Sequence, residues 1–430
     1  MGMTIPVHWD LASRIFPRLR TFLLIAGFSC QAGYGQQLSY TWEQLRAKFE
    51  AANPTVQAGQ LNIDESRAQE ITAYLRPNPD FSFTLDQIDP FPETPYRPFT
   101  FTEPLFGFDY LHERQHKREL RLESAKKGTG VAVAQQADLV RNLLFSLRNS
   151  FVQVLQQKQV LNLAHENLDY YDKLLSVSRD RFKAGDIAQV DLDRLELQRV
   201  QYETDIQTAT VNLRTAKIQL LMLLNDRTPV ERFDVTGPFE FKEQLAPLEE
   251  LRAAAMDARP DLRAAVLSID KAKTDHSLAV SNGSTDPTFS VDVGRNPPIQ
   301  AYLGFSVSIP LRIFDRNQGE KEKTDIDIRR NQRLQEASRA QVFSDVDSAF
   351  ATINSSLALL RPYKASYLQQ AAKVRDTIAF AYQHGGASLL DFMSAQSDYR
   401  AIQLNYLNLI GSYLTAASQL NLAVGREVIQ

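Results

Sequence analysis

The sequence predicts a mainly α-helical chain with a small β part, organised as a tandem structural repeat. Three observations in the 430 residues predict this fold class. Short motifs recur in the same order in both halves, long stretches carry a heptad repeat of apolar residues, and four short runs alternate apolar with polar residues. Long coiled-coil helices and four strands per chain are therefore expected.

The N-terminus has the features of a bacterial secretory signal. Arg14, Arg18 and Arg20 precede the apolar run 22–28, and small residues follow it. Residues 1–35 are therefore predicted to be a signal peptide, with a buried N-terminal helix as the alternative. Cys30 is a candidate for lipidation, and the competing interpretation is that it is removed with the signal.

Composition excludes several classes of protein. A single Cys cannot form an intrachain disulfide, and 48 basic against 51 acidic residues leave no basic excess that would indicate a nucleic-acid partner. No 18 consecutive residues are apolar, so no membrane-spanning helix is predicted. Composition does not separate a soluble protein from a membrane β-barrel, because the strands of such barrels are only weakly apolar.

The internal repeat appears as four matches at two sequence offsets. At the offset of 206 residues the matched segments are Glu43–Pro54 with Glu249–Pro260, Ile63–Asp64 with Ile269–Asp270, and 103–109 with 309–315. At the offset of 200 residues, Phe182–Asp191 matches Tyr382–Asp391. The predicted organisation is a first repeat, an inter-repeat linker rich in Pro and Gly, and a second repeat, at 36–228, 229–247 and 248–430.

Each repeat is predicted to contain a helix, two strands and two long helices. The strands are expected near 79–88 and 97–105 in the first repeat and near 286–294 and 301–311 in the second. Pro104 and Pro310 are expected to close the second strand of each pair. The apolar positions of the alternation form the predicted lipid-facing set, which is Phe81, Phe83, Phe99, Phe101, Phe289, Val291, Phe305 and Val307.

The long helices are predicted at 113–182, 187–225, 317–383 and 388–424, with Pro362 as a kink or boundary. Their apolar seven-residue repeat favours left-handed supercoiling with neighbouring helices. A coiled-coil protein with two incidental hairpins is the alternative, and the matching positions of the strands in both repeats argue against it. A closed barrel needs roughly eight or more strands, and one chain supplies only four. Two, three or four copies must therefore combine their strands.

The tandem repeat and three runs resemble the outer-membrane efflux protein family of the TolC type. The runs are ARPDLRAA at 258–265, IPLRIFDRNQG at 309–319 and YQHGGASLLDFMSAQSDY at 382–399. The resemblance implies a homotrimer with a 12-stranded barrel in outer-membrane lipid and a long α-barrel that extends into the periplasm. It also implies a passive exit duct without cofactor or enzymatic activity, joined by a periplasmic adaptor protein to an inner-membrane pump.

Two alternatives to an efflux duct remain open. One is the outer-membrane duct of a type I protein secretion system, which would share the architecture. The other is a periplasmic coiled-coil scaffold without a pore. The cargo, whether small molecules, metal cations or protein, is not determined by the sequence.

The same resemblance implies the functional residues. The two turns that join the long helices would be the periplasmic tips where the adaptor docks, with Gly185, Asp186, Gly385, Gly386 and Ala387 as contacts. Asp191, Asp391, Tyr382 and Arg194 would form a periplasmic gate. Ala387 stands where the family often has Arg, which leaves the ionic part of the gate open. The alternative for both Asp residues is an ordinary position at a helix N-terminus.

The run from His112 to His116 matches the HExxH pattern of zinc proteases. A catalytic site of that kind needs a third protein ligand, and Asp138 is the only acid between Ala125 and Ala164. The run is therefore interpreted as the start of a helix, and no metal site is predicted.

Overall fold

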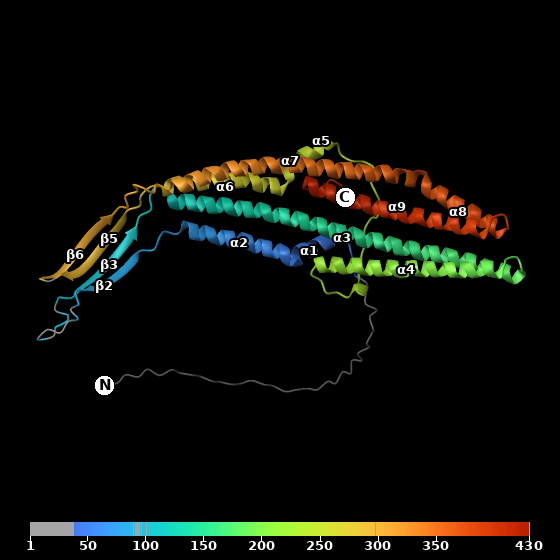
Figure 1. The fold of residues 1–430 in the computed structure, drawn as a ribbon, viewed down its shortest axis with the longest axis horizontal. Helices are drawn as coiled ribbons and strands as arrows, with labels where there is room; N and C mark the ends of the chain where they lie inside the picture. Colours follow the sequence, from blue (N-terminus) through green and yellow to red (C-terminus); the bar gives the residue numbers. More distant parts are fainter. Residues whose placement is uncertain are drawn as a thin grey trace, which may run out of the picture. The chain divides into compact units, whose positions relative to one another are not determined.

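The computed structural model describes residues 38–429 except residues 89, 91–94, 96, 100 and 297. The predicted signal peptide and Cys30 lie outside the described residues. The described residues all belong to one unit, Gln37–Gln430. Figure 1 shows long helices packed side by side, with a four-stranded sheet at one end of them and two helix–turn–helix ends at the other.

The same order of elements occurs in both halves. In the first half it is β1 (Leu38–Tyr40), α1 (Trp42–Ala52), α2 (Pro54–Tyr74), β2 (Asp80–Asp86), β3 (Glu103–Leu111), α3 (Lys117–Ala184) and α4 (Gln189–Leu223). In the second half it is β4 (Phe233–Val235), α5 (Leu248–Ala258), α6 (Pro260–Asn282), β5 (Thr288–Asn296), β6 (Ile299–Ser308), α7 (Gln318–Pro362), α8 (Leu368–Gln383) and α9 (Leu389–Val424), with α7 and α8 together in the place of α3.

Helices α2 and α6 both begin with a Pro. In each case the residue just before this Pro hydrogen-bonds to the end of a long helix. Asn53 caps α2, and its Nδ2 donates to the carbonyl oxygen of Leu223 at the end of α4, at 2.9 Å. Arg259 stands in the equivalent place before α6, and its Nη1 donates to the carbonyl oxygen of Ala423 near the end of α9, at 3.2 Å. Each bond satisfies one of the carbonyls that the last turn of a helix leaves without an intrahelical partner.

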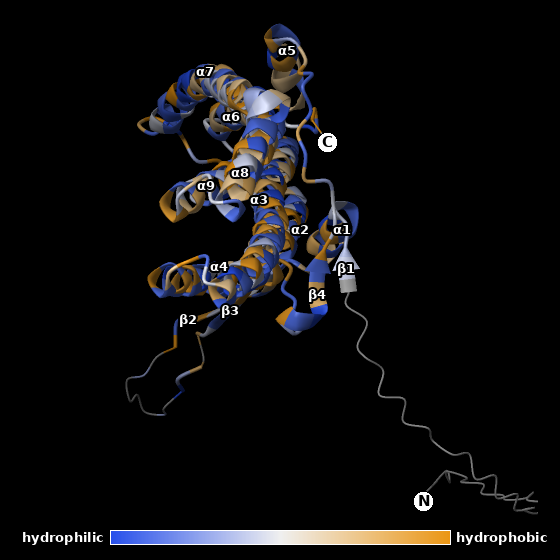
Figure 2. Ribbon diagram, turned by 90° about the vertical axis from the view of Figure 1, so that its right-hand side faces the viewer, coloured by the Kyte–Doolittle hydropathy of each residue, from blue (hydrophilic) through white to orange (hydrophobic). Residues whose placement is uncertain are grey.

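The long helices are held together by several apolar clusters. Helix α3 has 68 residues, which corresponds to roughly 100 Å at 1.5 Å per residue. It packs against α4 and α9, while α8 packs against α9. Figure 2 shows apolar and polar residues interleaved along the same helices. Within the described part of the chain, no helix is both long and apolar enough to cross a membrane.

Pro362 ends α7, and the chain continues through a π-helical turn, Tyr363–Tyr367, before α8 begins. The sequence interpretation left open a kink or a boundary at this Pro. A π turn accommodates one extra residue in a helix, and Pro weakens the ordinary hydrogen-bond ladder at this place.

The sheet has the antiparallel order β2-β3-β5-β6, and the position of β3 differs from the sequence prediction. A strand was expected near 97–105, but β3 spans Glu103–Leu111. Phe99 and Phe101 therefore lie before the strand, and Pro104 is near its beginning rather than at its end. The pairing of β3 with β5 begins at Leu105, so the missing N–H of Pro104 falls where β3 has only β2 beside it.

Two further expectations differ from the structure. The segments 103–109 and 309–315 match in sequence, but only the first forms a strand, because β6 ends at Ser308. The segment 229–247, expected to be a linker, contains β4, whose Phe233 and Val235 are fully buried and which pairs in parallel with β1. A strand of three residues whose partner is far away in sequence gives no periodic signal.

Candidate functional site

The four-stranded sheet has one apolar and one polar face. The register places Phe81, Phe108, Val291 and Phe305 in one cross-strand row. A second row on the same face contains Phe83, Phe106, Val293 and Leu303. All eight side chains are exposed.

The opposite face of the sheet is polar or small. One of its rows is Ser82, Gly107, Asp292 and Gly304. The outer strands β2 and β6 each pair on one side only among the described residues. An exposed apolar face of this size marks an interaction surface, and the free edges can pair with further strands.

Six residues of the predicted lipid-facing set fall on this apolar face: Phe81, Phe83, Phe289, Val291, Phe305 and Val307. Phe99 and Phe101 do not, because they precede β3. Phe106 and Phe108 take the corresponding places in β3. The alternation of Phe106, Phe108 and Tyr110 was a signal in the sequence that could have located this strand.

The two helix-joining turns have the same backbone geometry. Gly185 and Gly385 have φ values of +83° and +76°, in the left-handed region. The N–H of Asp186 donates to the carbonyl of Arg181, and the N–H of Gly386 donates to the carbonyl of Ala381, at 2.9 and 2.7 Å. These bonds close α3 and α8 in the way that a C-terminal glycine favours. Both turns are therefore exposed ends of helix pairs with the same hydrogen-bonded closure.

The two turns lie close together and share a cleft of about 440 Å³. Its lining includes Arg181, Asp186, Asp191, Arg194, Tyr382 and Ala387, so most of the predicted gate and tip residues meet here. Asp191 and Arg194 are 3.9 Å apart across one helical turn, and both are partly exposed. This pair is local to α4 and does not connect the two turns.

Arg181, which was not among the residues predicted for the gate, connects the two turns. Its Nη1 donates to the carbonyl oxygen of Tyr382 at 2.8 Å, and its guanidinium lies 5.5 Å from the centroid of the Tyr382 ring. Tyr382 stacks on Phe392 with centroids 5.2 Å apart, and burial raises the pKa of its phenol. Arg181 thus ties the end of α3 to the end of α8.

Asp391 has a local structural partner. Ser388 precedes α9, and its Oγ accepts from the N–H of Asp391 at 3.2 Å, while the Asp391 carboxylate accepts from the N–H and hydroxyl of Ser388. The Ser388 bonds hold the pKa of Asp391 below its usual value. The equivalent residue before α4 is Ala188, which offers no side-chain cap. A charged Asp391 is therefore fixed at the start of α9 by a capping box.

The HExxH run is not arranged as a metal site. Helix α3 begins only at Lys117, and His116 before it has φ of 55°, so the two His side chains do not share a helix face. Glu113 forms an ion pair with Arg121. Among the described residues, no group of three or more His, Cys, Asp or Glu side chains is placed to hold a metal ion.

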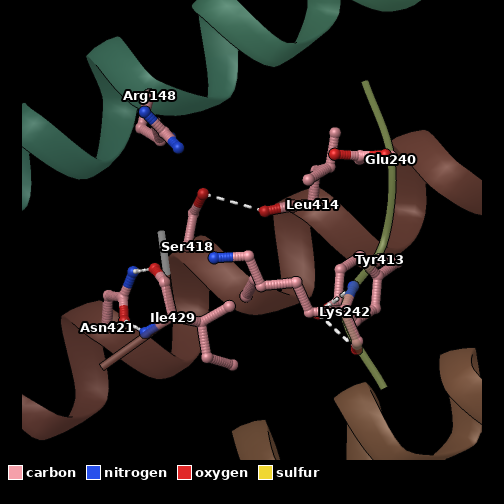
Figure 3. A pocket seen from close by; sticks show the side chains of 9 residues that line it. Arg148, Glu240, Lys242, Tyr413, Leu414, Ser418, Asn421 and Ile429 are labelled. Atoms are coloured by element: carbon pink, nitrogen blue, oxygen red, sulfur yellow. Dashed lines mark hydrogen bonds between the residues drawn. The ribbon is translucent and has the colours of Figure 1, made fainter. Parts of the chain in front are cut away.

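A second pocket lies between α3, α9 and the segment that contains Glu240 and Lys242 (Figure 3). Its volume of about 20 Å³ is enough for about one water molecule. Arg148 and Ser418 reach it from α3 and α9, and burial lowers the pKa of the Arg148 guanidinium. The pocket is too small for a transported molecule, and it lies on helices far along the chain from both turns.

Replacing Gly185 by Ala is expected to destabilise the first turn by roughly 1–2 kcal/mol, because an L-residue is strained at positive φ. Gly319, in the first turn of α7, has open space around its missing Cβ and no positive φ. The matched substitution Gly319→Ala should be neutral or slightly stabilising. Amide hydrogen exchange at the end of α3 would measure the difference, and equal exchange in the two variants would contradict the assigned geometry.

Comparison with known proteins agrees with this arrangement. Residues 251–426 match the family described as outer membrane efflux protein. The cobalt-zinc-cadmium resistance protein CzcC of Cupriavidus metallidurans is 23% identical over 386 residues, which is 87% of either chain. The outer membrane protein TolC of Escherichia coli is 22% identical over 324 residues, covering 70% of this chain and 64% of TolC.

Solved structures show the same fold. The CusC channel superposes with a TM-score of 0.76 at 16% identity, over 93% of this chain and 96% of CusC. The open-state outer-membrane channel MtrE of Neisseria gonorrhoeae superposes with a TM-score of 0.73 at 16% identity, over 90% and 89%. Residues 251–426 thus carry an outer membrane efflux protein domain, and the resemblance predicted from the sequence motifs is confirmed, together with the outer-membrane location that it implied.

Proposed function

We propose that this chain is one subunit of a homotrimeric exit duct for efflux across the bacterial outer membrane. Transport through it is passive, and a periplasmic adaptor and an inner-membrane pump supply the cargo and the energy. The observation that carries the proposal is the sheet with one exposed apolar face and two free edges, joined to long paired helices. The relatives are named as a cobalt-zinc-cadmium resistance protein and an outer membrane protein, which also supports a chain without enzymatic activity.

The sheet gives the proposal a physical basis. Free strand edges cannot face lipid, since no water is available there to satisfy the backbone. Three copies joined edge to edge would contribute 12 strands, with the apolar rows toward lipid and the row of Ser82 and Asp292 toward water. The helices would continue the passage into the periplasm and end at the Gly185 and Gly385 turns, where the adaptor docks.

Metal cations are the cargo class that we favour. CzcC, which carries cobalt, zinc and cadmium resistance in its name, aligns with 87% of this chain. A duct needs no metal-binding cluster, because specificity resides mostly in the pump. Small organic molecules are the second candidate, and a type I secretion duct would carry protein.

Conductance in planar lipid bilayers tests the proposal. The purified chain is expected to form discrete ion-conducting channels, because the joined strands enclose a polar passage. Phe305→Arg should abolish insertion, since an Arg on the lipid face costs about 2–4 kcal/mol near the middle of the bilayer. Ser306→Arg is the matched control, because Ser306 lies next to Phe305 on the opposite face.

Absence of channels from well-folded wild-type protein would leave the periplasmic scaffold as the better interpretation. Equal insertion by the two arginine variants would contradict the assignment of the faces. Deleting the gene and measuring accumulation of Co²⁺, Zn²⁺ and Cd²⁺ separates metal efflux from other cargo.

A further inference from the structure

Arg148 on α3 is a partly buried cation that is stacked on aromatic rings. Its guanidinium lies 4.5 Å from the centroid of the Trp42 ring and 5.7 Å from that of Phe151. The face of a ring attracts a cation, but it does not accept the N–H bonds that the edge of a guanidinium offers. Within the part of the chain that the structure describes, no hydrogen bond or ion pair ends on this side chain. Its N–H donors are therefore available to a further group.

The carboxylates that act on Arg148 do not compensate for its burial. They belong to Glu43 and Glu427, which favour the charged form from beyond the distance of an ion pair. Glu427 lies 3.9 Å from another cation, Arg46. Burial outweighs both carboxylates and lowers the pKa of the Arg148 guanidinium. A negative charge in direct contact with Arg148 would offset this cost.

Arg148 reaches the small pocket of Figure 3, together with a second cation. The figure shows the side chains of Arg148 and Lys242 both directed toward Ser418 of α9. Glu240 also lines the pocket, so two positive charges and one negative charge leave the lining with a net charge of +1. Glu240 and Lys242 are exposed, whereas Arg148 is partly buried. The pocket therefore has the charge that suits one monovalent anion.

Hydrogen bonds hold the walls of the pocket in place. The Tyr413 hydroxyl donates to the carbonyl oxygen of Lys242 at 3.0 Å, and it accepts from the N–H of Lys242 at 3.3 Å. After the end of α9, Asn421 Oδ1 accepts from the N–H groups of Val428 and Ile429 at 2.7 and 3.0 Å. The chain segments on both sides of α9 are thus fixed to it, and the pocket is formed before any ligand binds.

We propose that this pocket binds one small monovalent anion, such as chloride, between Arg148 and Lys242. Its volume of about 20 Å³ holds about one water molecule, and a chloride ion is only slightly larger. A water molecule could accept hydrogen bonds there, but it would not balance the charge. The Ser418 hydroxyl, which donates to the carbonyl oxygen of Leu414 at 2.9 Å, can rotate and donate to the anion instead.

The anion pocket joins three segments that are far apart in the sequence. Arg148 is on α3 of the first repeat, Lys242 lies between β4 and α5, and Ser418 is on α9 of the second repeat. A bound anion therefore links the two repeats within one copy. The inference goes beyond the proposed exit duct, because the pocket needs neither a second copy nor a passage.

Thermal unfolding of the full-length chain in detergent tests the anion pocket. The melting temperature Tm in sodium chloride is compared with Tm in sodium gluconate at the same concentration, because gluconate is too large for the pocket. An anion that binds only the folded state stabilises it, so saturating chloride is expected to raise Tm by roughly 2–4 °C. Bromide, which is close to chloride in size, should act in the same way. Broadening of the chloride NMR line by the protein detects the bound ion directly.

Lys242→Met has a matched control in the same segment. Lys242 is exposed, so its replacement removes a charge from the pocket and leaves the core intact. The chloride concentration that gives half of the Tm shift should rise about tenfold, because a charged hydrogen-bond donor is lost. Lys364→Met is the control, since exposed Lys364 pairs with Glu243 at 3.7 Å but does not line the pocket. Its response to chloride should equal that of the wild-type chain.

Arg148→Met should abolish the difference in Tm between chloride and gluconate, whatever the absolute Tm of this variant. Equal Tm in the two salts for the wild-type chain would overturn the inference. The same chloride effect in the wild-type chain and in Lys242→Met would also overturn it, because it would be a general effect of salt. If Arg148→Met does not fold, Lys242→Met and its control decide the question. Channels that conduct normally while Tm does not depend on chloride would leave the proposed duct standing and remove only the anion pocket.

Discussion

Arg259→Met is expected to lower the free energy of unfolding by about 3–5 kcal/mol, because removing one partner of a buried ion pair leaves the others uncompensated. The Arg259 side chain is only 4% exposed. It donates to both carboxylate oxygens of Asp261, to Asp345 on α7 at 2.7 Å and to the carbonyl of Ala423 on α9. One guanidinium thus joins three helices. Thermal or denaturant unfolding in detergent measures the loss.

A matched variant distinguishes this role from a general effect of losing an Arg. Arg333 pairs with Glu336 at 2.8 Å, but the two side chains are 81% and 61% exposed. Arg333→Met should therefore cost less than about 1 kcal/mol. A similar decrease in the free energy of unfolding in both variants would contradict the importance assigned to the buried Arg259 site.

The pH dependence gives a second readout of the Arg259 site. Burial alone would raise the pKa of Asp261, but hydrogen bonds and charge from Arg259 outweigh it and hold the pKa below the usual value. The folded state therefore binds this proton less readily than the unfolded state. The stabilisation is complete above the unfolded pKa of about 4 and disappears as the pH falls through the folded pKa. In Arg259→Met, the decrease in the free energy of unfolding at acidic pH should therefore be smaller.

Asp391→Asn is expected to relieve block of the channel by multivalent cations. If one Asp391 from each of three copies faces the axis, their carboxylates form a ring that attracts cations. Removing the charge should raise the half-blocking concentration of a trivalent cation about tenfold or more. Single-channel recordings with the cation added on the side of the helix turns measure it.

Ser388→Ala separates the charge of Asp391 from its role as a cap. This substitution removes the hydroxyl that bonds the Asp391 carboxylate but keeps the negative charge. It should weaken the start of α9 by about 1 kcal/mol and leave cation block unchanged. Unchanged block in Asp391→Asn, or relief in Ser388→Ala, would mean that Asp391 acts at the helix start and not as a gate.

Much of the helical part follows from the sequence, because long heptad patterns repeat their signal many times. The expected helix 187–225 is found as α4 from Gln189 to Leu223, and the expected 388–424 as α9 from Leu389 to Val424. The β part was harder to place. Strands of seven to ten residues contain few repeats of the two-residue alternation. The alternation at Phe99 and Phe101 therefore predicted a strand just before the position where β3 is found.

The residues at the two turns show a similar division. Gly185 and Gly385 were identifiable because a helix that ends in a left-handed residue favours Gly. The link from Arg181 to Tyr382 joins side chain and backbone about 200 positions apart, and no local pattern reports such a contact. Arg194 was named for the gate, but it bonds only its own helix neighbour, Asp191, among the described residues.

The sequence by itself determined the tandem organisation, the long helices and the amphipathic character of the strands, since these depend on residue spacing along one chain. Only the tertiary structure decided which apolar stripes are buried and which are left exposed. On α4 the heptad of Leu195 and the heptad of Val190 are equally regular in sequence. Burial against α3 covers the first, while the second stays exposed, because burial depends on which other elements fold against the helix.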